Sequence, residues 1–265
     1  MKRIRSQKER PSRRTRGGMK RGIYLLPNLF TTGSLFCGFY AIIASFNEKF
    51  LYAAVTIAIA VIFDGIDGKV ARLTKTTSRF GVEYDSLSDL VAFGVAPAIL
   101  VFAWALQPYG KFGWLAVFLY VACGALRLAR FNVQIDTVES RYFRGLPIPG
   151  AAGLIVATVF LFYRLDVRGE VTNLFILLLI YLLAFLMVSN IRYPSFKHLE
   201  LLKRKPFSTL VAIVLVIVVV VAEPAIVLFI FAAVYFLSGP AGVVRGWYRK
   251  RESAAHQEKT EPLTR

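Results

Sequence analysis

Eight long apolar runs follow one another along the chain, and this series constrains the fold more than any other feature of the sequence. A helix that crosses a bilayer needs about 20 mainly apolar residues, within a range of about 17–25. The runs are Leu29–Phe46, Leu51–Phe63, Leu90–Leu106, Phe112–Leu126, Leu146–Tyr163, Val171–Ile191, Phe207–Ala222 and Pro224–Val244. The second run is too short to cross alone, so we expect its helix to continue past Phe63 into polar sequence. The sequence therefore predicts an all-α integral membrane protein of about eight spans, with six spans as the main alternative.

The basic residues predict how these spans are oriented. Only 18% of the residues are charged, yet the net charge is +17. With the N-terminus in the cytoplasm, 29 of the 33 Lys and Arg residues fall on the cytoplasmic side, in segments 1–28, 64–86, 127–145, 192–206 and 245–265. The opposite side keeps Lys49, Lys111, Arg164 and Arg168. Because cytoplasmic loops of membrane proteins carry an excess of Lys and Arg, we expect a multi-pass protein of the inner (cytoplasmic) cell membrane with both termini in the cytoplasm.

The first 22 residues are the most basic part of the chain, with ten Lys and Arg residues and one acid. Near a membrane, each such charge gains about 1 kcal/mol from anionic lipid headgroups, so we expect this segment to contact them. An equally good interpretation is that these charges only set the orientation of the first span in the membrane. Aromatic residues do not alternate with the charges and no RNA-binding motif is present, so we expect no nucleic-acid partner.

Five of the sixteen acidic residues fall in one short stretch between the second and third runs. Asp64 and Asp67 are three residues apart, which places them on one face of a helix. Asp85 and Asp89 are four residues apart and share a face of the next helix. Because the intervening turn is short, we expect antiparallel neighbours whose four carboxylates converge at the cytoplasmic rim. Glu83 lies off the second face, and we interpret it as a residue of the rim.

Four converging carboxylates would repel one another strongly without cations. A ligand set of oxygens alone favours a hard ion such as Mg²⁺ or Mn²⁺, and four carboxylates can hold two ions about 3.5–4 Å apart. Gly68 and Ala71 leave room on the helix for a ligand, and Arg72 can bind a phosphate, so the sequence predicts phosphoryl-group chemistry. In the alternative, the acids pair as a solvated rim with four nearby cations, Lys69, Arg72, Lys75 and Arg79. Three of these four side chains should, however, point away from the helix face of Asp64 and Asp67.

The spacing of these residues resembles a family signature. From Asp64 to Asp89, the sequence matches every fixed position of the pattern D-x-x-D-G-x-x-A-R-x8-G-x-x-x-D-x-x-x-D, which is that of the CDP-alcohol phosphotransferases. Enzymes of this family are integral membrane proteins with a six-helix core, and they are usually dimeric. They join an alcohol to the phosphatidyl group of a CDP-linked lipid and release CMP. The resemblance implies a membrane transferase that forms a homodimer.

Three further stretches extend the resemblance. Leu26–Thr31, Ala125–Asn132 and Gly145–Gly153 are similar to the bacterial membrane-spanning phosphatidylserine synthases, and archaeal archaetidylserine synthases are similar too. This similarity implies transfer of the phosphatidyl group from CDP-diacylglycerol to the hydroxyl of L-serine, a step of phospholipid biosynthesis. The implied organisation is a basic cytoplasmic segment 1–22, a catalytic membrane domain 23–206 with the six-helix core, a C-terminal transmembrane helix pair 207–244 and a cytoplasmic tail 245–265.

The resemblance also implies roles for individual residues. Asp64 and Asp85 would bridge two metal ions. Asp67 would complete the coordination of one ion and Asp89 that of the other, and Asp89 would also be the catalytic base. The residues expected to contact the CDP-lipid are Asn28, Thr31, Gly68, Ala71, Arg72, Ser78 and Gly81.

The residues that bind serine are predicted from their position in the chain. A carboxylate is bound well by the fork of an arginine side chain. Arg127 and Arg130 lie three residues apart at the cytoplasmic end of the fourth span, with Asn132 just beyond. We expect these three residues to bind serine. The alternative is that the two arginines only anchor the span at the membrane surface.

Three other functions compete with this interpretation. The same chemistry with glycerol 3-phosphate would require a denser basic pocket for a phosphate, and an archaetidyl lipid could replace the diacylglycerol donor. A cation transporter would place acids near mid-span and polar residues along several helices. The last three runs contain almost no ionisable residues, apart from Glu223 in a loop, which favours the enzyme.

Overall fold

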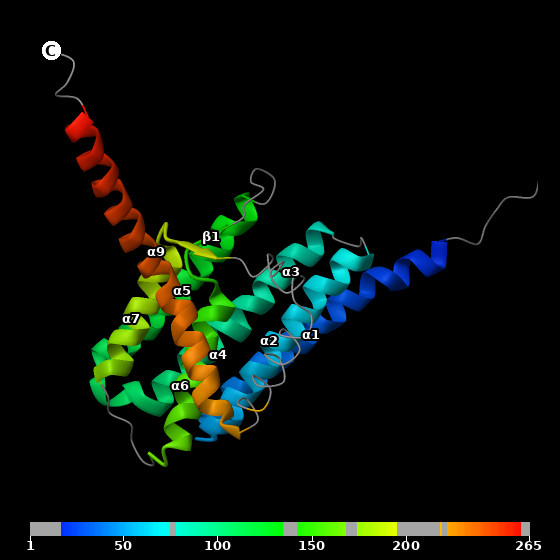
Figure 1. Ribbon diagram of the computed structural model, residues 1–265. Coiled ribbons are helices and arrows are strands. Elements are labelled where there is room, and N and C mark those ends of the chain that lie inside the picture. The colour runs from blue at the N-terminus through cyan, green and yellow to red at the C-terminus, as the bar shows by residue number, and fades with distance from the viewer. Residues whose placement is uncertain are drawn as a thin grey trace, which may run out of the picture.

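The computed structural model describes residues 17–74, 78–134, 142–167, 174–194, 218 and 222–260 (Figure 1). Its α-helices are α1 (Gly17–Phe46), α2 (Phe50–Thr74), α3 (Arg79–Asp89), α4 (Ala96–Val101), α5 (Lys111–Gln134), α6 (Ile148–Arg164), α7 (Leu174–Val188) and α9 (Pro224–Thr260). Two π-helical segments, η1 (Leu90–Val95) and η2 (Phe102–Leu106), flank α4, and a 3₁₀ turn, η3 (Gln107–Tyr109), follows. Strands β1 (Tyr142–Arg144) and β2 (Arg192–Pro194) pair antiparallel.

The helices have the length and composition of membrane spans. Within the described residues, five segments are long and apolar enough to cross a bilayer: Pro27–Phe46, Phe50–Val70, Arg79–Tyr109, Lys111–Val133 and Pro224–Val243. Helices α6 and α7 are apolar but shorter. The predicted seventh run, Phe207–Ala222, lies outside the described residues except for Val218 and Ala222. The prediction of a helical membrane protein is therefore confirmed at this level, with the short β1–β2 pair as an unpredicted addition.

Two helices carry the acidic residues past the limits of the apolar runs. Helix α2 continues beyond Phe63 to Thr74, as predicted. The third span begins at Arg79 rather than at Leu90, because the side-chain oxygen of Ser78 caps α3 by accepting a hydrogen bond from the Gly81 N–H at 3.0 Å. Such a cap satisfies a backbone donor that the first turn of a helix leaves free. The acids therefore lie on regular helix at one end of two spans.

The third span is interrupted directly after Asp89, where η1 begins. Pro97 has no N–H to donate to the carbonyl of Phe93, four residues earlier. The hydroxyl of Tyr120 on α5 donates to this carbonyl at 2.9 Å, and the Tyr120 side chain is fully buried. The break therefore begins at the residue that follows the last aspartate, and π-helical insertions often lie at functional sites.

Small residues bring the first helices close together. Alanines such as Ala41 on α1 and Ala53 on α2 are completely buried between neighbouring helices. At Gly38, a Cβ atom would lie only 2.6 Å from the Cα of Ala92, so α1 and η1 can approach this closely only at a glycine. Close backbone approach through small residues is typical of helices packed in membranes. Helix α1 packs against α2 and also against α3, so it is the shared neighbour of both acidic helices.

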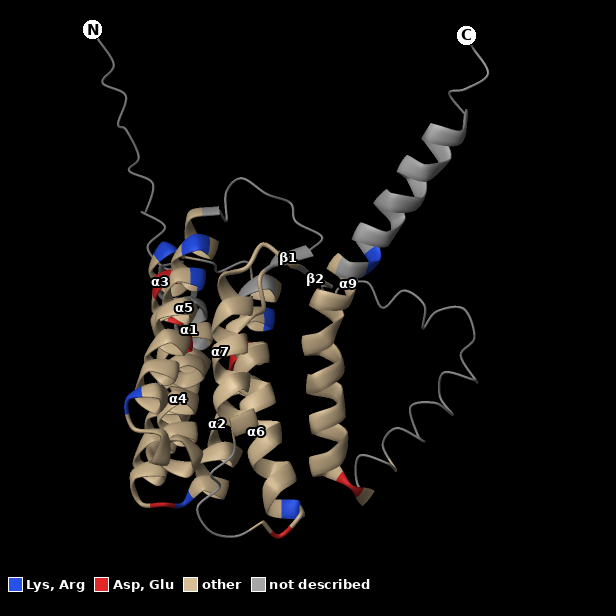
Figure 2. Ribbon diagram, turned by 90° about the vertical axis from the view of Figure 1, so that its left-hand side faces the viewer, with Lys and Arg blue, Asp and Glu red and all other residues tan. Residues whose placement is uncertain are grey.

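At each end of the bundle, one interaction joins neighbouring segments. Gly145 adopts a φ of +78°, and its N–H donates to the carbonyl of Ile191 at 2.8 Å. This bond holds the entry to α6 against the segment that follows α7. At the opposite end, Arg164 pairs with Glu223, which joins the end of α6 to the start of α9. Figure 2 shows the described basic residues gathered mainly at the end that carries α3 and the strands.

Candidate active site

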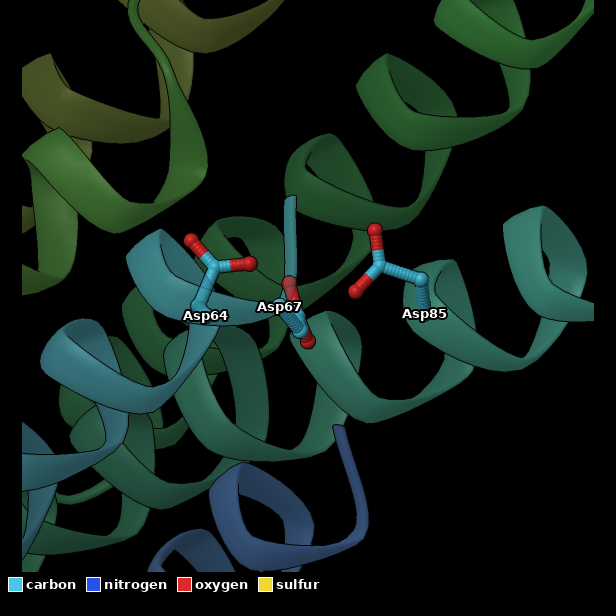
Figure 3. Close-up of side chains that lie close together, drawn as sticks. All are labelled: Asp64, Asp67 and Asp85. Atoms are coloured by element: carbon cyan, nitrogen blue, oxygen red, sulfur yellow. The ribbon is translucent and has the colours of Figure 1, made fainter. Parts of the chain in front are cut away.

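Three of the predicted aspartates meet at one point. Asp64 and Asp67 come from α2 and Asp85 from α3, and Figure 3 shows their carboxylates turned toward one another. One carboxylate oxygen from each lies within 4.8 Å of the other two. Asp67 is only 4% exposed, whereas Asp64 and Asp85 are partly buried. The spacings of three and four residues therefore produce the convergence that the sequence predicts for these residues.

The fourth aspartate lies beside this group. Asp89, one turn after Asp85, lies beside Asp64. The structure thus places Asp89 at the edge of the cluster, in contact with one of its members. We call Asp64, Asp67, Asp85 and Asp89 the aspartate cluster.

Helix α1 holds the aspartate cluster in place. The Thr31 hydroxyl donates to Oδ2 of Asp67 at 2.8 Å, and the Thr31 carbonyl accepts a hydrogen bond from the hydroxyl of Ser88 at 3.0 Å. Thr31 is buried and so connects α2 and α3 through α1. The sequence predicts that Thr31 contacts the CDP-lipid, and in the structure its hydroxyl contacts a carboxylate of the cluster. Ser88 occupies a variable position of the signature, so the pattern gave no reason to select it.

The donor set fits a hard divalent cation. All three converging groups are carboxylates, and such oxygens are the ligands that Mg²⁺ and Mn²⁺ prefer. Among the described residues, no Lys or Arg forms an ion pair with the aspartate cluster. Carboxylates held together in this way repel one another unless a cation or a shared proton neutralises them. The solvated rim, in which Lys and Arg side chains would pair with these acids, therefore has no support in the described part of the chain.

Several residues predicted to contact the CDP-lipid lie on the same helices as the aspartates, or on α1, which holds the cluster. Apart from the neighbouring backbone of α2 itself, no described atom lies within 4 Å of the position that a Cβ atom of Gly68 would occupy, so the described structure leaves open space here. Gly81 lies close to Ser78 and Asn28, whose side-chain oxygens would be 3.1 and 3.4 Å from a Cβ atom at Gly81. The side chains of Ala71 and Arg72, in the last turns of α2, lie outside the described residues.

The three residues predicted to bind serine have different neighbours. Arg127 interacts electrostatically with Asp89, and its enclosed Nε has no hydrogen-bond partner among the described residues. Arg130 instead donates to Oδ1 of Asn190 at 2.6 Å, beyond the end of α7. Asn132 bonds to Ser86 of α3 at 3.0 Å and to Glu83 at 3.3 Å. Of these three residues, Arg127 is the one that interacts electrostatically with the aspartate cluster.

Two tyrosines near the site were not predicted. The hydroxyls of Tyr84 and Thr32 lie 2.9 Å apart and connect α3 to α1. Tyr235, on α9, interacts electrostatically with Arg127. Because Tyr235 is far from the signature in the sequence, local spacing could not associate it with the site.

Comparisons with known proteins agree with this geometry. Residues 24–189 match the sequence model of the CDP-alcohol phosphatidyltransferases. The chain is 40% identical over 218 residues to the CDP-diacylglycerol–serine O-phosphatidyltransferase of Helicobacter pylori, covering 82% of this chain and 90% of the relative. It is 30% identical over 244 residues to the enzyme of that name from Mycobacterium leprae, covering 89% and 79%. The archaetidylserine synthase of Methanothermobacter thermautotrophicus is 39% identical over 171 residues, covering 64% and 69%.

The family match spans more than half of the chain and includes both acidic helices. It confirms the resemblance that the signature indicated, and it favours a transferase over a cation transporter. The chain belongs to the CDP-alcohol phosphatidyltransferase family.

Proposed function

We propose that this protein transfers the phosphatidyl group of CDP-diacylglycerol to the hydroxyl of L-serine, giving phosphatidylserine and CMP. The observation that carries the proposal is the convergence of Asp64, Asp67 and Asp85 next to Asp89 and Arg127. Such a site can bind the metal ions that a diphosphate requires and the carboxylate of an amino acid. The names of the relatives from Helicobacter pylori and Mycobacterium leprae support serine as the acceptor.

The aspartate cluster would hold two divalent cations, Mg²⁺ or Mn²⁺. Asp64 and Asp85 would bridge them, Asp67 would complete one coordination sphere and Asp89 the other. When bound, the ions would neutralise the diphosphate and polarise its phosphorus–oxygen bonds. Thr31 would keep Asp67 in position through its 2.8 Å hydrogen bond.

Asp89 is the proposed base. A serine hydroxyl is a weak nucleophile and needs a base within hydrogen-bond reach. Asp89 contacts Asp64 on one side and lies within electrostatic reach of Arg127 on the other. It would take the hydroxyl proton while the hydroxyl oxygen attacks the phosphorus on the lipid side. The bond from this phosphorus to the oxygen of CMP then breaks, and CMP leaves.

The CDP moiety would lie against the open face of α2 at Gly68. The space beside Gly68 supports this position, as does the group formed by Asn28, Ser78 and Gly81 at the start of α3. The signature implies that Ala71 and Arg72 complete the pocket. For serine, we propose Arg127 as the main ligand, while Arg130 and Asn132 would shape the site from their contacts with Asn190 and Ser86.

We further propose eight spans, with both termini and the active site on the cytoplasmic side of the inner membrane. Strand β2 lies at the bundle end that carries α3, whereas α9 begins at the opposite end, where Glu223 pairs with Arg164. Pro194 and Glu223 therefore lie at opposite ends of the bundle, which supports the proposed span at Phe207–Ala222. The excess of Lys and Arg on one side supports the orientation.

The remaining expectations concern organisation. We propose a catalytic membrane domain in 23–206, followed by the helix pair 207–244 and a cytoplasmic tail 245–265. Contact of the basic segment 1–22 with anionic lipid headgroups and assembly into a homodimer are part of the same proposal. Their support is the charge of that segment and the resemblance to the family.

One assay tests the function directly. Purified protein is incubated with CDP-diacylglycerol, radiolabelled L-serine and Mn²⁺ or Mg²⁺, and lipid and nucleotide products are separated. We expect labelled phosphatidylserine and an equal amount of CMP, both lost when EDTA removes the metal. A chain that gave no product, or that reacted only with glycerol 3-phosphate, would contradict the serine assignment. A parallel reaction with an archaetidyl donor tests the identity of the lipid.

A further inference from the structure

The side chain of Asn132 joins the end of α5 to α3. Its amide nitrogen donates to Oγ of Ser86 at 3.0 Å and to Oε2 of Glu83 at 3.3 Å. Because a carboxylate accepts hydrogen bonds and cannot donate them, the nitrogen of the amide, and not its oxygen, faces Glu83. The proton of Ser86 can go to Oδ1 of Asn132 at 3.2 Å or to the carbonyl of Val82 at 3.1 Å. Both N–H donors of Asn132 are therefore used within the protein.

Helix α3 depends on such contacts because it buries little apolar surface. It has 11 residues, all of them described, and Ser88 is the one among them that is buried. The side chains of Phe80 and Leu87 are exposed. A surface helix is usually oriented by the apolar stripe that it buries in the core. Since α3 buries no such stripe within the bundle, hydrogen bonds from its neighbours set its rotation.

These hydrogen bonds reach α3 from two neighbouring helices. Two of them come from α1, and one of these joins the Ser88 hydroxyl to the carbonyl of Thr31 at 3.0 Å. On the side of α5, Asn132 holds Glu83 and Ser86, which are three residues apart and share a helix face. The contacts with α1 alone would leave α3 free to pivot about the line that joins them, and the contact with α5 opposes this rotation.

The rotation of α3 matters for the aspartate cluster. Asp85 directly precedes Ser86 in the chain, and one of its carboxylate oxygens lies within 4.8 Å of oxygens from Asp64 and Asp67 on α2. Neighbouring residues are about 100° apart around a helix axis, so a rotation that shifts Ser86 also moves Asp85 relative to α2. We propose that Asn132 is a positioning residue for the metal side of the site, because it fixes α3 at the rotation that brings Asp85 to the aspartates of α2.

This role differs from the one predicted from the sequence, in which Asn132 binds serine. The N–H donors that a serine carboxylate would need are already bonded to Glu83 and Ser86. The inference rests on the proposed function, in which the aspartate cluster binds divalent cations. Residues that orient the ligands of a metal ion change its affinity by about 10- to 100-fold when they are substituted.

The test is Asn132→Leu, which keeps the approximate size of the side chain and removes its hydrogen bonds. We expect Mn²⁺ to bind about tenfold more weakly, measured by calorimetry on the purified full-length protein without substrates. At saturating Mn²⁺, the KM for L-serine should equal that of the wild type. A serine ligand predicts the reverse, with unchanged Mn²⁺ affinity and a raised KM for L-serine, and that result would overturn the proposal.

The matched control is Asn47→Leu at the opposite end of the bundle. The amide nitrogen of Asn47 donates to the carbonyl of Ile43, at the end of α1. This control should leave the Mn²⁺ affinity and the KM for L-serine unchanged. Equal weakening of Mn²⁺ binding in Asn47→Leu and Asn132→Leu would show a general effect on the helices, and would also overturn the proposal.

Ser86→Ala provides a second and milder test. It removes the contact of Asn132 with Ser86 and leaves the one with Glu83, so we expect Mn²⁺ affinity to fall less than in Asn132→Leu. In a chain that already carries Asn132→Leu, Ser86→Ala should have little further effect, because residues that share a contact are not additive. An equal loss of Mn²⁺ affinity in both backgrounds would contradict the role of Asn132.

The outcomes separate this inference from the function beneath it. A wild-type chain that bound no Mn²⁺ would overturn the proposed metal site and the role of Asn132 with it. A wild-type chain that bound Mn²⁺ but made no phosphatidylserine would overturn the proposed reaction, while the comparison of Mn²⁺ affinities would still decide the role of Asn132. An active wild-type chain whose Asn132→Leu variant bound Mn²⁺ with unchanged affinity would overturn the positioning role alone.

Discussion

The two ends of the helical bundle hold their carboxylates in opposite ways. At one end, Glu223 accepts two hydrogen bonds from Arg164, at 2.9 Å from Nε and 2.6 Å from Nη2, and both side chains are exposed. At the other end, Asp64, Asp67 and Asp85 bring their oxygens within 4.8 Å of one another. In the described part of the chain, no Lys or Arg forms an ion pair with them. Figure 2 shows acidic residues at both ends.

We interpret this difference as a division between a carboxylate that serves structure and the carboxylates of the proposed active site. An exposed ion pair is complete within the protein and contributes little to stability. Carboxylates that are buried together without a cation are costly, and residues of this kind in membrane proteins are usually functional. Glu223 has its counter-charge within the protein, whereas the proposed function gives the aspartate cluster a bound cation as its counter-charge.

The largest effect is expected for Asp85→Asn. The amide keeps the size of the side chain but removes one negative ligand from the cluster. We expect turnover to fall by about 10³-fold, as when a main electrostatic contact of an active site is lost. We also expect weaker Mn²⁺ binding, measured by calorimetry on the purified protein without substrate.

The matched control for Asp85→Asn is Glu48→Gln, which neutralises an exposed acid of the α1–α2 turn, at the opposite end. It should leave both turnover and Mn²⁺ binding at the wild-type level. If Asp85→Asn bound Mn²⁺ normally and remained active, the proposal that Asp85 belongs to a metal-binding active site would be contradicted.

A smaller, selective effect is expected for Arg127→Ala. The variant removes the guanidinium that faces Asp89, so the KM for L-serine should rise about 10- to 100-fold while the KM for CDP-diacylglycerol changes little. Arg130→Ala is the comparison, one helical turn away. Because Arg130 is bonded to Asn190, we expect it to raise the KM for serine less than Arg127→Ala does. Equal effects of both variants would instead favour a shared anchoring role.

The same pair of arginines shows how far sequence could predict the site. The aspartates follow from spacing alone, because residues three or four apart share a helix face whatever surrounds the helix. Arg127 and Arg130 have the same spacing, yet they differ in partner because Asn190 follows α7 and meets only Arg130. That contact joins residues 60 positions apart, and a local pattern contains no information about it.

Other parts of the fold also separate into features that local sequence predicts and features that depend on long-range contacts. The continuation of α2 to Thr74 follows from the length that a span requires. The π-helical break after Asp89 depends on Pro97 together with a hydroxyl from Tyr120 on another helix. Tyr235 interacts electrostatically with Arg127 although the two residues are far apart in the sequence, because α9 packs beside α6. Long-range packing of this kind decides the neighbours of Arg127, whereas helical periodicity decides the convergence of the aspartates.

A moderate effect is expected for Thr31→Val, which keeps the shape of the side chain and removes the hydrogen bond to Asp67. A buried hydrogen bond to a charged group contributes about 1.5–3 kcal/mol, so we expect turnover or Mn²⁺ affinity to fall about tenfold. Thr56→Val is the control, because the Thr56 hydroxyl donates only to carbonyls of its own helix. Equal loss in both variants would show that the effect comes from helix stability and not from the position of Asp67.

The smallest effect is expected for Glu223→Gln, which breaks the exposed pair at the opposite end. The Arg164 guanidinium holds the pKa of Glu223 below its usual value of 4.5. A lowered pKa in the folded state means that the pair stabilises the protein at neutral pH, and that this contribution is lost as the pH falls below about 4.5. We therefore expect the variant to melt slightly below the wild type at pH 7 and together with it at pH 3.5, in thermal unfolding monitored by circular dichroism. Turnover at pH 7 should not change, because the charge at this end is already balanced within the protein. A loss of turnover comparable to that of Asp85→Asn would mean that Glu223 also takes part in catalysis and is not a purely structural residue.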